Sequence, residues 1–272
     1  MNKIRHKVKI KMAKVGIRTE EEIKFLKKSG WIAACALKKT LESAKEGISL
    51  IELDKIAEKE IIKLGGQSSF KTVPGYQFTT CLTLNAEIVH GIPRDIKLVE
   101  GDILSVDLGA VYPAPAGWHT DAAWSILIGQ CTGDGQQEEK KRFLEIGEKT
   151  LWRALEKAVA GGRIGDISAT IQQEIEGAGY NVVKSLAGHG VGRLAHEEPE
   201  IPTFGKNGTG LQLQKGMSVA VEIIYTIGKG KIFEKKDGWT IASKDKSLGG
   251  LFEMSIIVRD GRPEVLTDWR VV

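Results

Sequence analysis

The chain has 272 residues, of which 42% are hydrophobic and 27% charged, and its formal net charge is +4. These proportions are those of an ordinary globular protein, and they argue against a disordered or a membrane-spanning chain. The length allows one large domain or two small ones with a buried core.

A basic run, MNKIRHKVKIKMAK, opens the chain without an acidic residue. We interpret residues 1–12 as a basic N-terminal extension, either a flexible solvated tail or a segment that contacts an anionic partner such as RNA. The run lacks the apolar segment of a secretory signal peptide, so we expect a cytoplasmic protein.

Two helices are predicted after this run. Thr19 and Glu22 form a capping box, and apolar residues at helical spacing predict a helix over about residues 20–45. Gly47 ends this helix. The stretch SLIELDKIAEKEIIKLGG then predicts a second helix that ends near Gly65.

The same order of elements returns in the second half of the chain. A long charged helix is predicted over about residues 137–160, and the stretch GDISATIQQEIEGAG predicts a shorter one after it. A shift of 114 positions places Gly47 on Gly161 and Gly65 on Gly179. We therefore favour an internal duplication over chance similarity.

Short β-type runs follow each pair of helices. Because the strands and helices are segregated, and no linker rich in proline or serine divides the halves, the pattern predicts an α+β fold with antiparallel sheets. A functional site is expected between the two related halves. The runs are TCLTLNAEIVHGI, DILSVDLGAVY and AAWSILIG in the first half, and MSVAVEIIYTI, GWTIA and FEMSIIV in the second.

Two aspartates lie in neighbouring strands of the first half. Strand alternation places Asp107 and Asp121 on the face opposite the apolar residues of their runs. The turn YPAPAG between the runs predicts a hairpin, and if the hairpin is symmetric about Ala114 the two aspartates lie opposite each other. Facing carboxylates repel unless a proton or a cation lies between them. The alternative is that both are exposed on a solvated face of the sheet.

Two glutamates interrupt the apolar runs of the second half. Burying Glu222 or Glu253 is expensive unless the acid is paired or bound to a metal, so each is either a salt-bridge partner or a ligand. Together with Asp107, Asp121 and the glycine-framed His189, they point to a two-metal hydrolytic site that holds Mn, Fe, Co or Zn. The cysteines share no C-x-x-C spacing, which argues against a disulfide framework or a thiolate zinc site; they are Cys35, Cys81 and Cys131.

The remaining histidines are sorted by their surroundings. The stretch GHGVGRLAHEEP places His189 and His196 seven positions apart, so they are two ligands, a ligand and a catalytic group, or two surface residues. His90 follows an apolar run in VHGIP, where a turn presents it at the rim of a cleft. His119 precedes Asp121 by two positions and is either a ligand or a turn residue.

Seven stretches occur in an order that resembles the type I methionine aminopeptidases, which have the pita-bread fold. The likeness covers about residues 13–265 and implies two pseudo-symmetric halves with antiparallel sheets covered by helices. It also implies a single catalytic domain over residues 13–272. The stretches are LNAEIVHGIP, GDILSVDLG, GWHTDAAW, GHGVGRLAHEEP, GMSVAVE, KDGWT and LFEMSIIV.

The resemblance also implies roles for the site residues. His90 and His196 face the substrate as catalytic groups, and Glu222 acts as a proton shuttle. His119 matches a position that is not a ligand. The implied metal ligands are Asp107, His189, Glu222 and, bridging two divalent ions, Asp121 and Glu253.

The methionine pocket that the resemblance implies is apolar. Tyr76, Cys81 and Trp239 line it, and His90 and His196 lie on its substrate side. Several positions depart from the pattern of the family, and they leave every ligand in place while they change the expected shape of the pocket. The departures are Phe70, Val73, Ala195, Ile223, Leu251 and Met254, with a longer turn between Asp107 and Asp121.

The resemblance implies a metal-dependent aminopeptidase that removes the initiator methionine from nascent polypeptides by dinuclear metal-activated water. The alternatives are an aminopeptidase of the same fold with another first-residue specificity, such as Xaa-Pro cleavage, and a non-catalytic module that binds peptides or RNA. We expect a monomer without a membrane or a specific nucleic-acid ligand. Contact of the basic extension with the ribosome is a further hypothesis, based on its charge.

Overall fold

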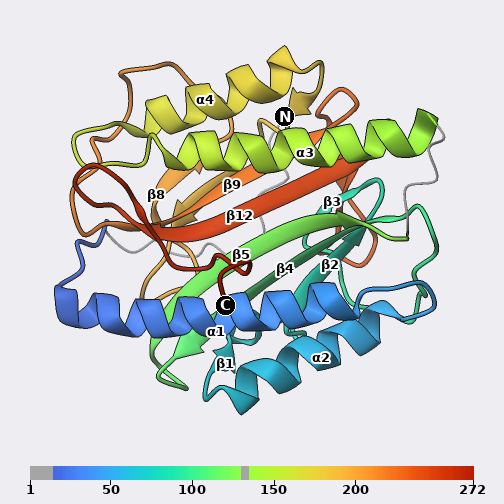
Figure 1. Cartoon of the computed structure of the whole chain (residues 1–272), viewed down its shortest axis with the longest axis horizontal. Coiled ribbons are helices and arrows are strands. Elements are labelled where there is room, and N and C mark those ends of the chain that lie inside the picture. The colour runs from blue at the N-terminus through green and yellow to red at the C-terminus, as the bar shows by residue number, and fades with distance from the viewer. Residues whose placement is uncertain (1–14, 130–134) are drawn as a thin grey trace.

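The computed structural model describes residues 15–129 and 135–272. The basic extension at residues 1–12 and Cys131 lie outside the described residues. Within these residues, α-helices cover one face of a large sheet: α1 packs on β4 and β5, and α3 packs on β9 and β12 (Figure 1). The helices are α1 (Glu20–Ser43), α2 (Leu50–Lys63), α3 (Gly135–Leu155) and α4 (Ile164–Gly177), with a short 3-10 turn, η1 (Phe70–Thr72).

The large sheet has ten strands within the described residues, and its pairings are antiparallel. Its central order is β1-β4-β5-β12-β9-β7-β8, so β5 and β12 join the two halves of the chain. The strands are β1 (Gln67–Ser68), β2 (Thr80–Leu84), β4 (Ile103–Tyr112), β5 (Trp118–Leu127), β6 (Asn181–Val182), β7 (Ala187–Gly190), β8 (Glu197–Pro202), β9 (Ser218–Thr226), β12 (Gly249–Ile257) and β13 (Glu264–Val265). A second sheet contains β3 (Glu87–Val89), β10 (Ile232–Glu234) and β11 (Ile241–Ser243).

The element boundaries follow the local chemistry of the chain. The predicted capping box is confirmed: the Thr19 hydroxyl accepts from the Glu22 N–H, and the Glu22 carboxylate accepts from the Thr19 N–H. The helix predicted over residues 137–160 ends earlier, at Leu155, and continues into turns. The strand predicted in GWTIA begins only at Ile241, because Asp237 accepts hydrogen bonds from the N–H groups just before it.

The internal repeat is confirmed by equivalent hydrogen bonds in the two halves. The Gly47 N–H donates to the Leu98 carbonyl over 2.9 Å, and 114 positions later the Gly161 N–H donates to the Leu213 carbonyl over 2.9 Å. Both glycines have a positive φ, +87° and +89°, which favours glycine because it has no Cβ. The same shift carries α2 onto α4 and β1 onto β6. The halves are therefore structurally as well as sequentially related.

The hairpin between β4 and β5 confirms the predicted turn but corrects its register. Asp107 pairs with Ala123, and Gly109 pairs with Asp121, so the hairpin is symmetric about Pro115 and not about Ala114. The two aspartates are therefore diagonal neighbours and do not lie directly opposite each other. An offset of two residues keeps both side chains on one face of the sheet.

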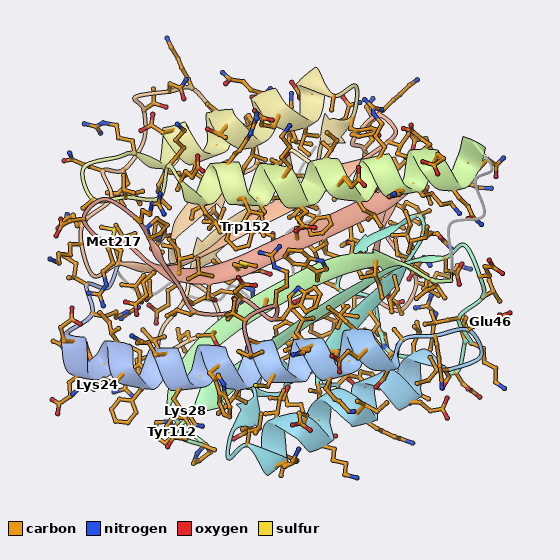
Figure 2. The ribbon with its side chains drawn as sticks, in the orientation of Figure 1. Lys24, Lys28, Glu46, Tyr112, Trp152 and Met217 are labelled. Atoms are coloured by element: carbon orange, nitrogen blue, oxygen red, sulfur yellow. The ribbon has the colours of Figure 1, made fainter. Side chains whose placement is uncertain are left out.

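One hydrophobic core runs through both halves under the helices. It includes Leu104 and Val106 of β4 as well as Val221 of β9 and Phe252 of β12. Trp152 of α3 lies between its helix and the strands (Figure 2). Because side chains alternate along a strand, the residues between these core positions point to the face of the sheet that the helices leave open. Among the described residues, no helix is long and apolar enough to cross a membrane.

Candidate active site

Four carboxylates gather on the open face of the large sheet, two from each half of the chain. Asp107 of β4 and Asp121 of β5 come from the first half, and Glu222 of β9 and Glu253 of β12 from the second. Glu253 pairs with Glu222 on one side and with Ala123 on the other, which places it at the junction of the halves. One oxygen each of Asp107, Asp121 and Glu253 lies within 4.8 Å of the other two.

His189 of β7 joins this carboxylate cluster. Its Nε2 lies 3.7 Å from Glu253 Oε1 and 4.0 Å from Asp121 Oδ2. Its Nδ1 lies 2.9 Å from the Gly190 carbonyl, so Nδ1 carries the proton and donates it there. This hydrogen bond fixes the tautomer and leaves the Nε2 lone pair directed at the carboxylates, as in a metal-binding histidine.

His196 lies beside His189. The ring centroids are 4.3 Å apart, with an angle of 57° between the rings. One ring nitrogen of His196 also lies within 4.8 Å of ligand atoms of Asp121 and His189, whereas Glu222 belongs to neither group of close ligand atoms in the described residues. Geometry alone thus allows His196 as a ligand, and its implied role as a catalytic group needs a separate test.

The electrostatics of the cluster favour uncharged side chains when no cation is present. Burial, with repulsion from neighbouring acids, raises the pKa of Asp107 and of Glu253 well above the ordinary values. Burial also raises the pKa of Asp121 to about 7, and burial and Asp121 raise that of Glu222 to about 8. Burial lowers the pKa of His189 to about 3, so its imidazole is neutral at pH 7.

The cluster fits divalent metal ions. Asp107 Oδ1 and Glu253 Oε1 are buried without a hydrogen-bond partner, and such orphaned acceptors are costly unless a cation satisfies them. Two atoms that each lie about 2.0–2.2 Å from one ion are at most about 4.4 Å apart. The spacing of His189 Nε2 from Asp121 and Glu253 satisfies this limit. Carboxylates with one neutral imidazole suit Mn, Fe, Co or Zn.

A hydrophobic cluster contains the residues expected in the methionine pocket, and we call it the pocket cluster. The Tyr76 ring lies 4.9 Å from the Trp239 ring and 6.4 Å from the Phe70 ring, in edge-to-face geometry. The Tyr76 hydroxyl donates to the Thr80 carbonyl over 2.7 Å and accepts from Cys81 Sγ over 3.3 Å. The pocket cluster consists of buried Phe70, Tyr76 and Cys81, with partly buried Val73, Phe78, Ile92 and Trp239 packed against them.

Comparison with known proteins identifies the family. Residues 24–259 match metallopeptidase family M24. The chain belongs to metallopeptidase family M24. It is 36% identical to a methionine aminopeptidase of Clostridium perfringens, over 92% of this chain and 98% of that protein, and 35% identical to methionine aminopeptidase 1 of Bacillus subtilis, over 92% and 98%.

A solved structure of this M24 group has the same fold. The methionine aminopeptidase of Thermotoga maritima superposes with a TM-score of 0.87 at 36% identity, covering 93% of this chain and 99% of that one. The predicted pita-bread α+β fold and the predicted resemblance to methionine aminopeptidases are therefore confirmed. Use of divalent metal ions follows from membership of the metallopeptidase family.

His90 occupies a strained position in this M24 chain. It directly follows β3, is half-buried, and has a φ of +57°, a left-handed conformation that residues with a Cβ rarely adopt. Such strain is typical of functional positions. Glu87, three positions earlier, accepts hydrogen bonds from Arg94 over 2.8 Å and Lys235 over 2.5 Å. This carboxylate holds together the segments on both sides of His90 and the β10–β11 hairpin.

His119 has a hydrogen-bond partner outside the carboxylate cluster. Its Nδ1 lies 2.8 Å from Ser69 Oγ, and it belongs to neither group of close ligand atoms among the described residues. Burial and the nearby His196 lower its pKa to about 4, so the ring is neutral at pH 7. Its backbone N–H donates to the Gly192 carbonyl over 2.7 Å, which attaches β5 to the loop before His196.

Three residues of the pocket region were not predicted from the sequence. Phe78 and Ile92 pack in the pocket cluster, and only their nearness in sequence to Tyr76 and His90 hints at this. Asp54 of α2 is a buried acid whose Oδ1 accepts from the N–H groups of Thr79 and Thr80 over 2.9 and 2.8 Å. It fixes the start of β2, which carries Cys81, and an acid at helical spacing gives no sequence signal for such a role.

The carboxylate cluster predicts that the metal-free protein loses stability as pH rises from 6.5 to 8.5. Asp121 and Glu222 have ordinary pKa values of 3.8 and 4.5, which the fold raises to about 7 and about 8. The folded state therefore binds more protons than the unfolded state in this range, and stability is lost as pH rises through the folded pKa values. We expect the free energy of unfolding to fall by about 1–3 kcal/mol across this range, which lowers the melting temperature by about 2–10 °C.

This prediction is measured by thermal unfolding in chelator and in saturating Mn(II). The window starts at pH 6.5 because below that value the lowered pKa of His189 makes a contribution of the opposite sign, which rises with pH. Mn(II) binds the ionised acids, so it should remove the loss and raise the melting temperature most at pH 8.5. A metal-free melting temperature that rises across this window would contradict the prediction.

Proposed function

We propose that this M24 metallopeptidase is a metal-dependent aminopeptidase that removes methionine from the N-terminus of polypeptides. The observation that carries the proposal is the presence of two groups of residues in the same chain. One is the cluster of buried carboxylates with His189, and the other is the apolar, aromatic pocket cluster. The relatives with high coverage are named methionine aminopeptidases, and this supports the choice of substrate.

We assign two divalent metal ions to the carboxylate cluster. Four ionised acids carry a charge of −4, which two divalent ions balance. Asp121 and Glu253, which meet at the junction of the halves, would hold the ions at its centre. His189 and Glu222 complete the site on the side of the second half, and Asp107 on the side of the first. Bound ions supply Lewis-acid polarisation of the scissile carbonyl and lower the pKa of water.

The chain's own residues orient the substrate and move protons. The pocket cluster receives the first side chain and excludes water from it. We propose that His90 and His196 hydrogen-bond the scissile amide and stabilise the oxyanion that develops on its carbonyl. Glu222 is the proposed proton shuttle toward the leaving amine, because a carboxylate can accept a proton and pass it on as a general acid–base group.

Release of methionine from a peptide such as Met-Ala-Ser by protein loaded with Mn(II) or Co(II) tests this function. A panel of peptides varied at the first two positions separates methionine removal from another specificity, such as Xaa-Pro cleavage. Chelator should abolish the release, and added metal should restore it. No release of any first residue at any metal concentration would overturn the proposal and favour a binding module.

Phe70→Ala is expected to weaken the preference for methionine. Phe70 is buried against Tyr76. Shortening its side chain to alanine therefore leaves a cavity in the pocket cluster and removes apolar contacts. A hydrophobic pocket discriminates similar side chains by about 1–3 kcal/mol, so the ratio of kcat/KM for methionine over a bulkier first residue should fall about 10-fold or more. The lower kcat/KM for methionine peptides should come from a higher KM more than from a lower kcat.

Phe25→Ala is a matched control for this substitution. Phe25 lies on α1, is 39% exposed and belongs to none of the hydrophobic clusters of the described chain. Both variants are assayed with peptides that begin with methionine, leucine or phenylalanine. Equal specificity ratios in the Phe70 variant and the wild type would show that Phe70 does not line the pocket.

We further propose a cytoplasmic monomer in which residues 13–272 form one catalytic domain. The shared core that runs through both halves supports a single domain. We propose that the basic extension at residues 1–12 contacts the ribosome, on the strength of its charge. Unchanged co-sedimentation with ribosomes after its deletion would argue against this, and light scattering measures the oligomeric state.

A further inference from the structure

An ion pair between Arg18 and Glu197 contacts the loop that carries His196. Arg18 precedes α1, and Glu197 is the first residue of β8, directly after His196. The Arg18 side chain is 10% exposed and that of Glu197 2%. Neither residue belongs to the carboxylate cluster or the pocket cluster, so the mechanism above leaves this buried pair without a function.

The Arg18 guanidinium joins several segments that are far apart in sequence. Besides the ion pair, its Nε donates to Ser218 Oγ over 2.9 Å, and a terminal nitrogen donates to the Val191 carbonyl over 3.1 Å. It also lies 5.2 Å from the centre of the Trp118 ring. The planar guanidinium thus connects the segment before α1 with β9, with β5 and with both ends of the loop over residues 191–197.

Glu197 holds the same loop from the other side. Its Oε1 accepts from the backbone N–H groups of Arg193 and Leu194 over 2.6 and 3.1 Å, while Oε2 accepts from Arg18. The loop therefore turns around a carboxylate whose charge is balanced by the guanidinium. His196 is adjacent to this carboxylate in sequence, so its backbone position depends on the pair.

The guanidinium and the carboxylate pack directly against the backbone of Gly192, so a side chain there would displace them. A Cβ atom added to Gly192 would lie 2.1 Å from an Arg18 nitrogen and 2.8 Å from Glu197 Oε1. The backbone approaches the ion pair this closely only because residue 192 is glycine. The segment before α1 is itself attached: the Arg18 N–H donates to the Gly216 carbonyl over 2.8 Å, and Ile17 pairs with Met217, near the end of the molecule where α1 begins (Figure 2).

We propose that Arg18 is a positioning residue that acts through Glu197 to hold the imidazole of His196 against the active site. The inference rests on the proposed catalytic function of His196. The pair fixes both ends of the loop, and His196 is at one of them, 4.3 Å from the His189 ring. Without the guanidinium, Glu197 is a buried charge without its counter-ion, and the loop must rearrange to hydrate it.

Arg18→Ala should lower kcat about 10- to 100-fold, the range for removal of groups that orient metal-site residues, with KM changed less than about 3-fold. Arg18→Lys should give an intermediate loss, because an ammonium keeps the charge but does not reach Ser218, Val191 and Glu197 together. Metal stoichiometry should be unchanged. Glu197→Gln serves as a second variant if Arg18→Ala does not fold, and it should show the same loss in kcat.

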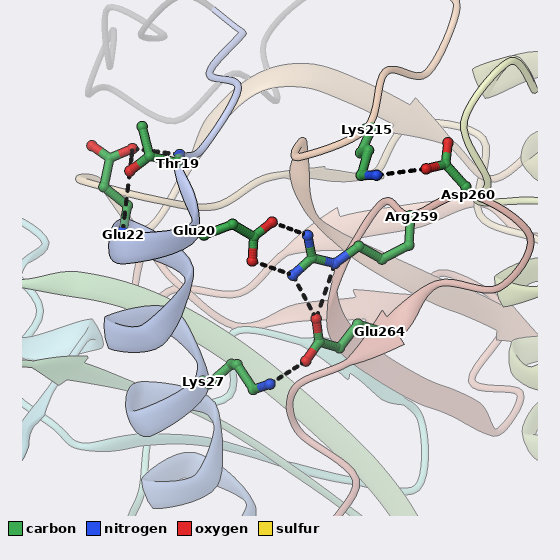
Figure 3. A network of polar contacts seen from close by, with 8 residues as sticks. All are labelled: Thr19, Glu20, Glu22, Lys27, Lys215, Arg259, Asp260 and Glu264. Carbon is green, nitrogen blue, oxygen red and sulfur yellow. Dashed lines mark hydrogen bonds and ion pairs between the residues drawn. The ribbon is translucent and has the colours of Figure 1, made fainter.

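Arg259→Ala is the matched control. Arg259 pairs with Glu20 and Glu264 near the start of α1, as Figure 3 shows, and this network lies outside the site. Both substitutions remove an arginine ion pair next to the same helix. A purely structural role for Arg18 would lower the melting temperature in both variants and leave kcat alike, and that result would overturn the inference.

A spectroscopic measurement separates this inference from the proposed function. In histidine-labelled protein, the imidazole signals of His196, assigned with His196→Gln, should shift or broaden in Arg18→Ala and stay unchanged in Arg259→Ala. If the wild type released no methionine, the proposed function would fail, whereas the imidazole signals would still report on positioning. Unchanged His196 signals in Arg18→Ala would overturn the inference even in a fully active enzyme.

Discussion

Asp121→Asn should abolish methionine release while it stabilises the metal-free protein. Asp121 is buried at the junction of the halves, with Asp107, Glu253 and His189 as neighbours. An amide is a poor ligand for divalent ions compared with a carboxylate, so kcat/KM should fall at least about 1,000-fold, beyond the roughly 10- to 100-fold effect of outer groups. Removing one acid also removes repulsion that raises the pKa of Glu222 and Glu253.

The two effects have opposite signs, and this makes the test sharp. In chelator at pH 8, the variant should unfold at a higher temperature than the wild type, whereas saturating Mn(II) should raise the melting temperature of the wild type only. Asp260→Asn is the control, because Asp260 is an exposed partner of Lys215 outside the site (Figure 3). Wild-type turnover in Asp121→Asn would rule out the metal site described here.

His196→Gln should lower kcat about 100- to 1,000-fold and leave the metal stoichiometry at the wild-type value. Loss of a group that stabilises an oxyanion or transfers a proton has effects of about this size. The structure leaves two chemical roles open, since His196 lies within ligand distance of Asp121 and His189. The metal content of the variant separates the two roles, because loss of a ligand lowers metal binding whereas loss of a substrate-facing group does not.

His189→Gln supplies the comparison for this variant. His189 has its Nδ1 hydrogen bond to Gly190 and its Nε2 directed at the acids, so its substitution should reduce metal affinity together with kcat. Metal titration by calorimetry and single-turnover release of methionine are measured on both variants. Equal loss of metal from the two variants would reassign His196 as a ligand.

The residues on the open face of the sheet were predictable from the sequence because strand alternation has a period of two. The register of the β4–β5 hairpin was predicted about Ala114 and is centred on Pro115, yet Asp107 and Asp121 share a face in both cases. A shift of an even number of residues preserves the face and changes only the spacing. The glycines that recur after a shift of 114 positions likewise predicted the repeat, since Gly47 and Gly161 both have a positive φ.

Features made by distant segments were not predictable in this way. Arg18 and Glu197 are 179 positions apart, and neither has a periodicity or a motif that links it to the other. Asp54 positions β2 through contacts with Thr79 and Thr80, which depend on how α2 packs. Similarly, the nearness of His196 to Asp121 follows from the path of the loop after β7, which local preferences do not determine.

The relation between the two halves has a consequence for how such a site arises. The repeat that carries α2 onto α4 also places Asp107 of β4 and Glu222 of β9 in equivalent strands, as it does Asp121 of β5 and Glu253 of β12. Each half on its own holds two of the four acids, so neither half forms the carboxylate cluster without the other. The two halves have also become unequal: the first carries most of the pocket cluster, whereas the second carries its Trp239 together with His189 and His196.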